Sequence, residues 1–423
     1  MPHANNFQHS EYSRADPGER LAYRDLTTDP APDSPAWHDQ MGVHGQRLSQ
    51  AGVRLAVFAH GAPLGTDLFG AQRLDEVGGL KRGYSRGISG LDALLALLRE
   101  DTNGLSGPPG WPVPPWTNVA TLQRAVDDTV RDAANFSQDY IDRFKKGVNR
   151  GAPRPIACER YLWSCEGHHL GRARAACVLL EQLRQWADFY GLTTGDRILV
   201  QAHGQAGLVL ALVSNLLNPA PLSGRPQLFH ALELDADQSP SPPVTRAQLE
   251  QLESALGEPG FLRGAVVDVV TLGTPVRYGW DLDGVGALLH LINHRVLRLD
   301  GKRWLAKMEL PQVTMEMPIA WGGDYVQQLA VAGSDARPAT PDAQAINKML
   351  WELLEPWDGF ERWLESARRS VRCPNDGQCR LIDYKDSTGS ATARDHYYGH
   401  AAYTRMNAML FNLGEIVAAC YAA

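Results

Sequence analysis

The residues with the clearest potential for chemistry lie at 202–207, which read Ala-His-Gly-Gln-Ala-Gly. An apolar stretch at 197–203 leads into them and a helical stretch at 206–217 follows, which predicts a sharp turn from strand to helix. Small residues, here Ala202 and Ala206, flank such a turn because larger side chains would collide with the neighbouring strand and helix. A serine at the centre of the turn would serve as a nucleophile for acyl transfer.

The centre of this turn is Gly204, which has no side-chain oxygen and cannot form an acyl-enzyme. Glycine accepts a positive φ freely, whereas a serine held in that conformation costs about 1–3 kcal/mol of backbone strain. Natural loss of a serine and its deliberate replacement would both leave this residue. An ordinary strand-to-helix turn would share the pattern, so the rest of a site has to be sought after the neighbouring strands.

Short apolar stretches alternate with amphipathic stretches along the chain, at spacings that require crossover connections. Strands are expected at 53–61, 160–164, 197–203, 265–273, 328–333 and 380–384. Helices are expected at 88–100, 117–147, 170–189, 206–217, 244–257 and from about 403 to 420. The predicted fold class is therefore α/β, with a mainly parallel central sheet and helices on both faces. Ligands of such sheets bind at the carboxyl ends of the strands.

One large domain is expected at 51–423, preceded by a loose surface segment at 1–50 that is rich in Pro, Asp and Ser. Residues 108–116, Pro-Pro-Gly-Trp-Pro-Val-Pro-Pro-Trp, exclude regular structure. Together with the helix expected at 117–147 they form an insertion at about 101–150. This insertion is either a lid over an apolar pocket or a surface strap.

A second strand end carries His60 and Gly61, followed by Ala62 and Pro63. Two backbone N–H donors aimed at one point can stabilise the oxyanion that develops during acyl transfer. One donor would come from this loop and one from the residue after the nucleophile position, which gives Ala62 and Gln205 as candidates. Pro63 is excluded because it has no backbone N–H. A plain strand-ending turn is the alternative interpretation of His60 and Gly61.

Several blocks of the sequence resemble lipase- and esterase-like α/β hydrolases. Residues 57–61, VFAHG, look like the VFVHG opening of that fold, and 272–275, LGTP, are similar to the GTP turn after its sixth strand. The elbow and helix at 203–217, with 163–172 and 399–404, resemble a bacterial branch whose elbow reads GHSHAGN. These blocks span roughly residues 50–415, and the departure that matters is Gly204 in place of serine.

The resemblance implies a nucleophile, an acid and a histidine in that order along the chain. The acid is expected after the next-to-last strand, where Asp335 fits the slot and Asp324 is the alternative. The histidine is expected after the last strand, where His400 fits and His396 is the runner-up. In a working site the acid orients the imidazole, and the imidazole accepts the proton of the nucleophile.

Other histidines also fall near the expected strand ends. His168 and His169, with Glu166, suggest a metal, but adjacent helical histidines point in different directions and no third ligand is near in the sequence. No metal and no cofactor is therefore expected, and a role at the helix start or in the pocket is favoured. The residues expected to line a pocket are His60, Gly61, His203, His168, His169 and His396.

Composition narrows the classes of protein. The chain has 423 residues, of which 44% are hydrophobic, so a large buried core is expected. A net charge of −7 without a basic stripe argues against nucleic-acid binding, and no apolar run reaches the roughly 18 residues of a membrane span. The start lacks a secretory signal, which favours the cytoplasm, with signal-independent export as the alternative. The six scattered cysteines are expected as free thiols, although Cys373 and Cys379 could close a small loop.

The sequence thus favours a lipase- or esterase-like serine hydrolase fold for carboxylic esters or lipids, inactive because Gly204 occupies the nucleophile position. One alternative is a non-catalytic scaffold that binds a ligand or a protein. Another is an active hydrolase in which His400 or His203 activates water, although that route forfeits the covalent step.

Overall fold

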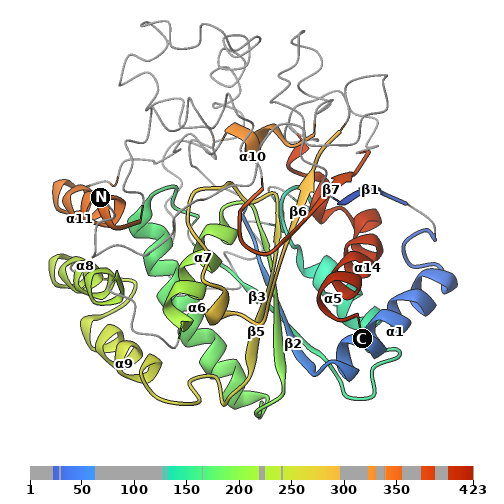
Figure 1. Ribbon diagram of the computed structural model, residues 1–423, viewed down its shortest axis with the longest axis horizontal. Coiled ribbons are helices and arrows are strands. Elements are labelled where there is room, and N and C mark those ends of the chain that lie inside the picture. Colours follow the sequence, from blue (N-terminus) through green and yellow to red (C-terminus); the bar gives the residue numbers. More distant parts are fainter. Residues whose placement is uncertain are drawn as a thin grey trace, which may run out of the picture.

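A single parallel β-sheet runs through the centre of the protein in the computed structural model (Figure 1). The structure describes residues 22–27, 30–61, 127–128, 131–163, 165–218, 224–239, 242–295, 323–329, 338, 340–354, 373–385 and 399–422. The strands are β1 (Ala22–Asp25), β2 (Val53–Ala59), β3 (Ala157–Tyr161), β4 (Arg197–His203), β5 (Val266–Leu272), β6 (Ala287–Asn293) and β7 (Gln378–Asp383). They lie in the order β1-β7-β6-β5-β4-β2-β3, and every adjacent pair is parallel.

The central strands β2, β4, β5 and β6 are mostly apolar because both faces of the sheet are covered there. In β2, Leu55 and Val57 point into one hydrophobic core, and Ala56 and Phe58 point into the other. This alternation follows from the two-residue period of a strand. A strand buried on both faces reads as a continuous apolar run, which is why β2, β4 and β5 could be recognised in the sequence.

Helices form a layer on each face of the sheet (Figure 1). One layer contains α6 (His169–Phe189), α7 (Ala206–Leu217), α8 (Gly224–Gln238), α9 (Arg246–Leu256) and α11 (Pro341–Leu354). The other contains α1 (Pro35–Gln50), α5 (Gln138–Val148) and α14 (Met409–Cys420). Shorter elements are α10 (Tyr325–Leu329) and the 3₁₀ turns η1 (Leu282–Gly284), η5 (Ala402–Thr404) and η6 (Met406–Ala408). The predicted α/β class, with a parallel sheet between two helical layers, is confirmed.

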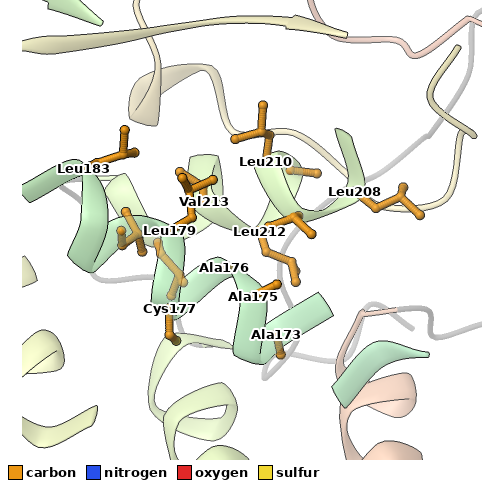
Figure 2. Packing of buried hydrophobic residues seen from close by; sticks show 14 of the residues in the cluster. Ala173, Ala175, Ala176, Cys177, Leu179, Leu183, Leu208, Leu210, Leu212 and Val213 are labelled. Carbon is orange, nitrogen blue, oxygen red and sulfur yellow. The ribbon is translucent and has the colours of Figure 1, made fainter. Parts of the chain in front are cut away.

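The helix α7, which follows the bend at Gly204, is held in place by its packing against α6 (Figure 2). Small side chains on α6, among them Ala173 and Ala176, are fully buried in the shared core. Leu212 and Val213 of α7 are likewise fully buried. Small residues let two helices approach closely, and the leucines around them fill the remaining space. The start of α7 is therefore held by the core rather than by local propensity alone.

Several elements differ from the sequence-based expectation. The segment expected as a loose wrap at 1–50 contributes β1 and the 16-residue helix α1, which packs against α5 and α14. The strand expected at 160–164 lies at Ala157–Tyr161. Residues 328 and 329, expected to begin a strand, belong to α10, while 330–333 are outside the described residues. The strand β6 was not predicted, and the last helix starts at Met409 after two 3₁₀ turns.

The insertion expected as a lid is only partly described. Its final part forms α5, where Tyr140, Ile141 and Phe144 are buried in the core. The ring of Phe144 meets that of Phe58 on β2 at a centroid distance of 5.0 Å. This part of the insertion therefore belongs to the helical layer and not to a lid. The helix expected at 88–100, the loop at 108–116 and most of the 117–130 stretch lie outside the described residues.

Candidate active site

Gly204 lies at the sharp bend between β4 and α7, as the sequence predicts. Its φ is +55°, a left-handed conformation that favours glycine. The bend is held on both sides, because Gly204 N donates to Leu272 O at 2.9 Å and Thr274 Oγ1 donates to Gly204 O at 2.9 Å. Gly207 allows this second contact, since a Cβ there would lie 1.9 Å from Thr274 Oγ1.

The imidazole of His400 lies directly against Gly204. A Cβ placed on residue 204 would be 2.6 Å from His400 Nε2 and 3.3 Å from His400 Cε1. The His400 side chain is buried, and its ring lies 4.2 Å from the ring of His203, centroid to centroid. The structure thus brings together the nucleophile position and the histidine expected from the sequence, and the histidine ring occupies part of the space that a larger residue 204 would need.

The carboxylate beside His400 belongs to Asp324. His400 Nδ1 lies 2.7 Å from Asp324 Oδ2, and the Asp324 side chain is fully buried. The other oxygen, Oδ1, accepts a hydrogen bond from Gln327 N at 2.8 Å, which fixes the carboxylate at the start of α10. Asp335 lies outside the described residues. The place of the acid next to His400 is therefore taken by the residue that the sequence offered as the alternative.

The contacts of Asp324 also set the tautomer of His400. An ionised carboxylate only accepts hydrogen bonds, so the Asp324–His400 contact requires the proton on Nδ1. In neutral imidazole the lone pair is then on Nε2, the atom that faces the Cβ position of residue 204. A nitrogen in this state can accept a proton from a hydroxyl group placed there.

The three parts of the site follow three strands of the sheet. Gly204 follows β4, Asp324 comes after β6, and His400 comes after β7. Because all strands are parallel, their carboxyl ends lie at one edge, and residues far apart in the chain meet there. His203 Nε2 donates to His400 O at 2.8 Å, which ties the histidine loop to the residue that precedes the bend.

The segment after β2 passes close to the same bend. A Cβ on Gly61 would lie 1.9 Å from His203 O and 3.2 Å from Gln205 N, so glycine is required for this approach. Gln205, the expected oxyanion donor on α7, is buried, and its side-chain Oε1 accepts from Arg172 Nη2 at 3.1 Å. Ala62, the other expected donor, lies outside the described residues.

His60 is held in place by the turn that follows β3. Trp163 Nε1 donates to His60 O at 2.8 Å, and Cys165 Sγ lies 3.7 Å from His60 Nδ1. Burial, with a smaller contribution from the Arg160 guanidinium, lowers the pKa of His60 to about 3. Burial also raises the pKa of the Cys165 thiol, so this pair is neutral and lacks the thiolate of a reactive cysteine.

The paired histidines at the start of α6 are structural in their contacts. His168 is the N-cap, and its Nδ1 accepts from Gly171 N at 2.9 Å. His169 Nδ1 lies 2.7 Å from Tyr278 Oη, which also accepts from Arg172 Nη1 at 3.1 Å. Within the described ranges no group of three or more His, Cys, Asp or Glu residues could hold a metal ion. His396 lies outside the described residues.

Sequence reasoning missed several residues that contact the site. Thr274 lies in the LGTP block, but nothing in that block indicates its hydrogen bond to Gly204 O. Arg172 lies in the 163–172 block and is fully buried beside Gln205. Tyr403 lies three residues after His400 and donates to Asp324. Each was part of a quoted block, so the resemblance marked the segment but not the role of the side chain.

No protein-family model, no curated protein and no solved structure matches this chain. Among the described helices, none has the length and hydropathy needed to cross a membrane. In the described part of the chain, none of the six cysteines, Cys373 and Cys379 included, forms a disulfide.

Two of the buried histidines are expected to make stability depend on pH. Burial lowers the pKa of His60 to about 3 and that of His203 well below the ordinary 6.5, so both are neutral in the folded protein at moderately acidic pH. Above pH 6.5 neither affects stability, but below it the unfolded chain binds protons that the folded chain excludes. From about pH 7.5 to about pH 5, each histidine should lower the free energy of unfolding by about 2 kcal/mol. Urea unfolding at the two pH values measures this loss.

His203→Gln is the matched control, because the glutamine amide can still donate to His400 O. The variant should lose about 2 kcal/mol less than the parent chain over the same pH range. Equal losses in both chains would mean that His203 becomes protonated within the folded protein.

Proposed function

We propose that this protein has the α/β-hydrolase fold and a site for acyl transfer from carboxylic esters or lipids, disarmed by Gly204. The observation that carries the proposal is the line of contacts Asp324–His400–residue 204. His400 Nδ1 lies 2.7 Å from the buried Asp324 carboxylate, and its Nε2 lies 2.6 Å from the Cβ position of residue 204. A strand-to-helix turn without a catalytic role would not be expected to lie against a buried aspartate–histidine pair.

The order of the parts along the chain supports the same proposal. The bend comes first, the acid follows β6, the next-to-last strand along the chain, and the histidine follows β7, the last. The α/β hydrolases arrange nucleophile, acid and histidine in this order, with a loop from a neighbouring strand completing the oxyanion hole. Here Gly61 after β2 lies so close to the bend that a Cβ on residue 61 would be 1.9 Å from His203 O and 3.2 Å from Gln205 N.

With serine at residue 204, the side chains present would perform acyl transfer as follows. His400 Nε2 accepts the hydroxyl proton while the serine oxygen adds to the ester carbonyl, and Asp324 stabilises the imidazolium that forms. The imidazolium returns this proton to the alcohol that leaves as the ester bond breaks, and water, activated by the same imidazole, then releases the acid from the acyl-enzyme. The backbone N–H of Gln205 would donate to the developing oxyanion. With glycine there is no attacking oxygen and no covalent intermediate, so a ligand bound at this position would not be turned over.

The test compares the protein that has Gly204 with its Gly204→Ser variant in the hydrolysis of p-nitrophenyl esters with short and long acyl chains. We expect no hydrolysis above the buffer rate from the glycine chain and clear hydrolysis from the serine variant. Hydrolysis by the glycine chain that is abolished by His400→Gln would overturn the proposal in favour of water activation. Silence of both folded chains, with a binding partner recovered by pull-down, would favour a scaffold.

A further inference from the structure

The hydroxyl group of Tyr403 shares the Asp324 carboxylate with His400. Tyr403 Oη lies 2.9 Å from Asp324 Oδ2, the same oxygen that lies 2.7 Å from His400 Nδ1. The direction of the Tyr403 contact is fixed, because Tyr403 Oη also accepts from Asn293 N at 2.8 Å. A backbone N–H can only donate, so the hydroxyl proton of Tyr403 is left for the carboxylate.

A glycine at the end of β5 makes room for this arrangement. Gly273 has a φ of +64°, and a Cβ there would lie 2.6 Å from Asp324 Oδ2 and 2.7 Å from Tyr403 Cε2. Any larger residue at 273 would press on the carboxylate and on the tyrosine ring together. The close approach of Tyr403 to the acid therefore depends on a specific residue of the sheet and is not an accident of loop packing.

Tyr403 is also rigidly held. It is fully buried, and its ring packs edge-to-face on Tyr384 at 5.0 Å, centroid to centroid. Burial and the neighbouring Asp324 charge raise the pKa of Tyr403 well above the ordinary value, so the hydroxyl keeps its proton at neutral pH. Tyr403 therefore acts as a hydrogen-bond donor to the carboxylate there.

We propose that Tyr403 is a positioning residue that sets the strength of the Asp324–His400 hydrogen bond. Two donors on one carboxylate oxygen share its charge, so each bond is weaker than it would be alone. Removing the Tyr403 hydroxyl takes one donor from Oδ2 and should shorten the bond to His400. Tyr403 would thereby hold the acid in place and moderate its pull on the imidazole proton. The part of this inference that concerns hydrolysis rests on the proposed function.

The chemical shift of the His400 Hδ1 proton measures the strength of this hydrogen bond and does not require an active enzyme. In the chain as given, its resonance is expected in the low-field region of the proton NMR spectrum, and its loss in His400→Gln assigns it. Tyr403→Phe should move the resonance further downfield, because the remaining hydrogen bond strengthens. Tyr384→Phe is the matched control, since it removes a buried hydroxyl that donates to Asn412 Oδ1 at 2.8 Å instead of to the Asp324 carboxylate. The control should leave the resonance in place.

A resonance that does not move in folded Tyr403→Phe, or that moves equally in Tyr384→Phe, would overturn the inference. In the Gly204→Ser background, Tyr403→Phe also removes a hydrogen bond that holds the Asp324 carboxylate in place, so the imidazole is aimed less well and kcat should fall about ten-fold while KM stays within about two-fold. If Gly204→Ser is inactive but the resonance still moves, the proposed function fails while the role of Tyr403 stands. The two conclusions are therefore separately testable.

Discussion

Gly204→Ser is expected to raise kcat/KM for a p-nitrophenyl ester by about 10⁴-fold over the chain as given. A complete Ser-His-Asp arrangement contributes on the order of 10⁶-fold to kcat. The new Cβ would lie 2.6 Å from His400 Nε2, so the imidazole has to retreat by several tenths of an ångström. Because a misplacement of about 1 Å costs about 10²-fold, the variant should reach only part of the full effect.

Gly204→Ala is the matched control for this gain. It adds the same Cβ at the same positive φ and pushes on the same imidazole, but it supplies no hydroxyl. Both variants should lower the free energy of unfolding by about 1–3 kcal/mol, measured by urea unfolding, because a side chain at this φ is strained. Activity in the serine variant alone would assign the gain to the hydroxyl. Equal rates in the two variants, both folded, would contradict the assignment of residue 204.

Asp324→Asn in the Gly204→Ser background is expected to lower kcat about 10³–10⁴-fold, whereas Asp335→Asn should change it less than about three-fold. The asparagine amide can place an N–H where the carboxylate accepted one, so His400 would be driven to the tautomer with its proton on Nε2. That tautomer cannot accept a proton from a serine hydroxyl introduced at residue 204. The measurement is steady-state turnover of the two double variants.

This pair of variants decides between the two acids that the sequence left open. The folded state of Asp324→Asn has to be checked by its unfolding transition, because the carboxylate also accepts from Gln327 N and Tyr403 Oη. A large loss of kcat in Asp335→Asn with little loss in Asp324→Asn would reverse the assignment and place the Asp324–His400 contact outside the catalytic mechanism.

The turn at residue 204 could be predicted because its parts are contiguous in the sequence. An apolar strand, small flanking residues and an apolar helix leave a local pattern, and both β4 and α7 lie at the expected positions. The same is true of α6 and of β5, whose apolar runs and helical spacing are long. Each of these elements can be predicted from its own residues, because the apolar side chains that face the core recur at a regular spacing along it.

The residue proposed as the acid was harder to choose because the strand before it was missed. Residues 287–293, ALLHLIN, form β6, but a short apolar run of this kind does not distinguish a strand from a buried helix. The sequence instead suggested a strand at 328–333, which moved the expected acid to Asp335. With β6 in place, the acid slot opens after Asn293, and Asp324 N in fact donates to Asn293 O at 3.1 Å.

Contacts between residues far apart in the chain could not be predicted, because they leave no local pattern in the sequence. Tyr403 meets Asp324 across 79 positions, and Thr274 meets Gly204 across 70. Such pairs are set by how the strand ends and loops come together, which spacing within one segment does not encode. In the segment before residue 51 a local signal was present but was overlooked. Its Pro and Asp content suggested a loose wrap, although Ser34 caps a well-formed helix there.

The central claim is that residue 204 faces an activated imidazole, and a covalent probe tests it most directly. Gly204→Ser, Gly204→Ala and the chain as given are each treated with an alkyl fluorophosphonate, which reacts with activated serines, and the peptide that contains residue 204 is weighed by mass spectrometry. We predict one phosphonyl adduct on that peptide in the serine variant, lost in Gly204→Ser with His400→Gln, and none in the other two chains. A folded serine variant that stays unmodified, or that is modified equally without His400, would contradict the account.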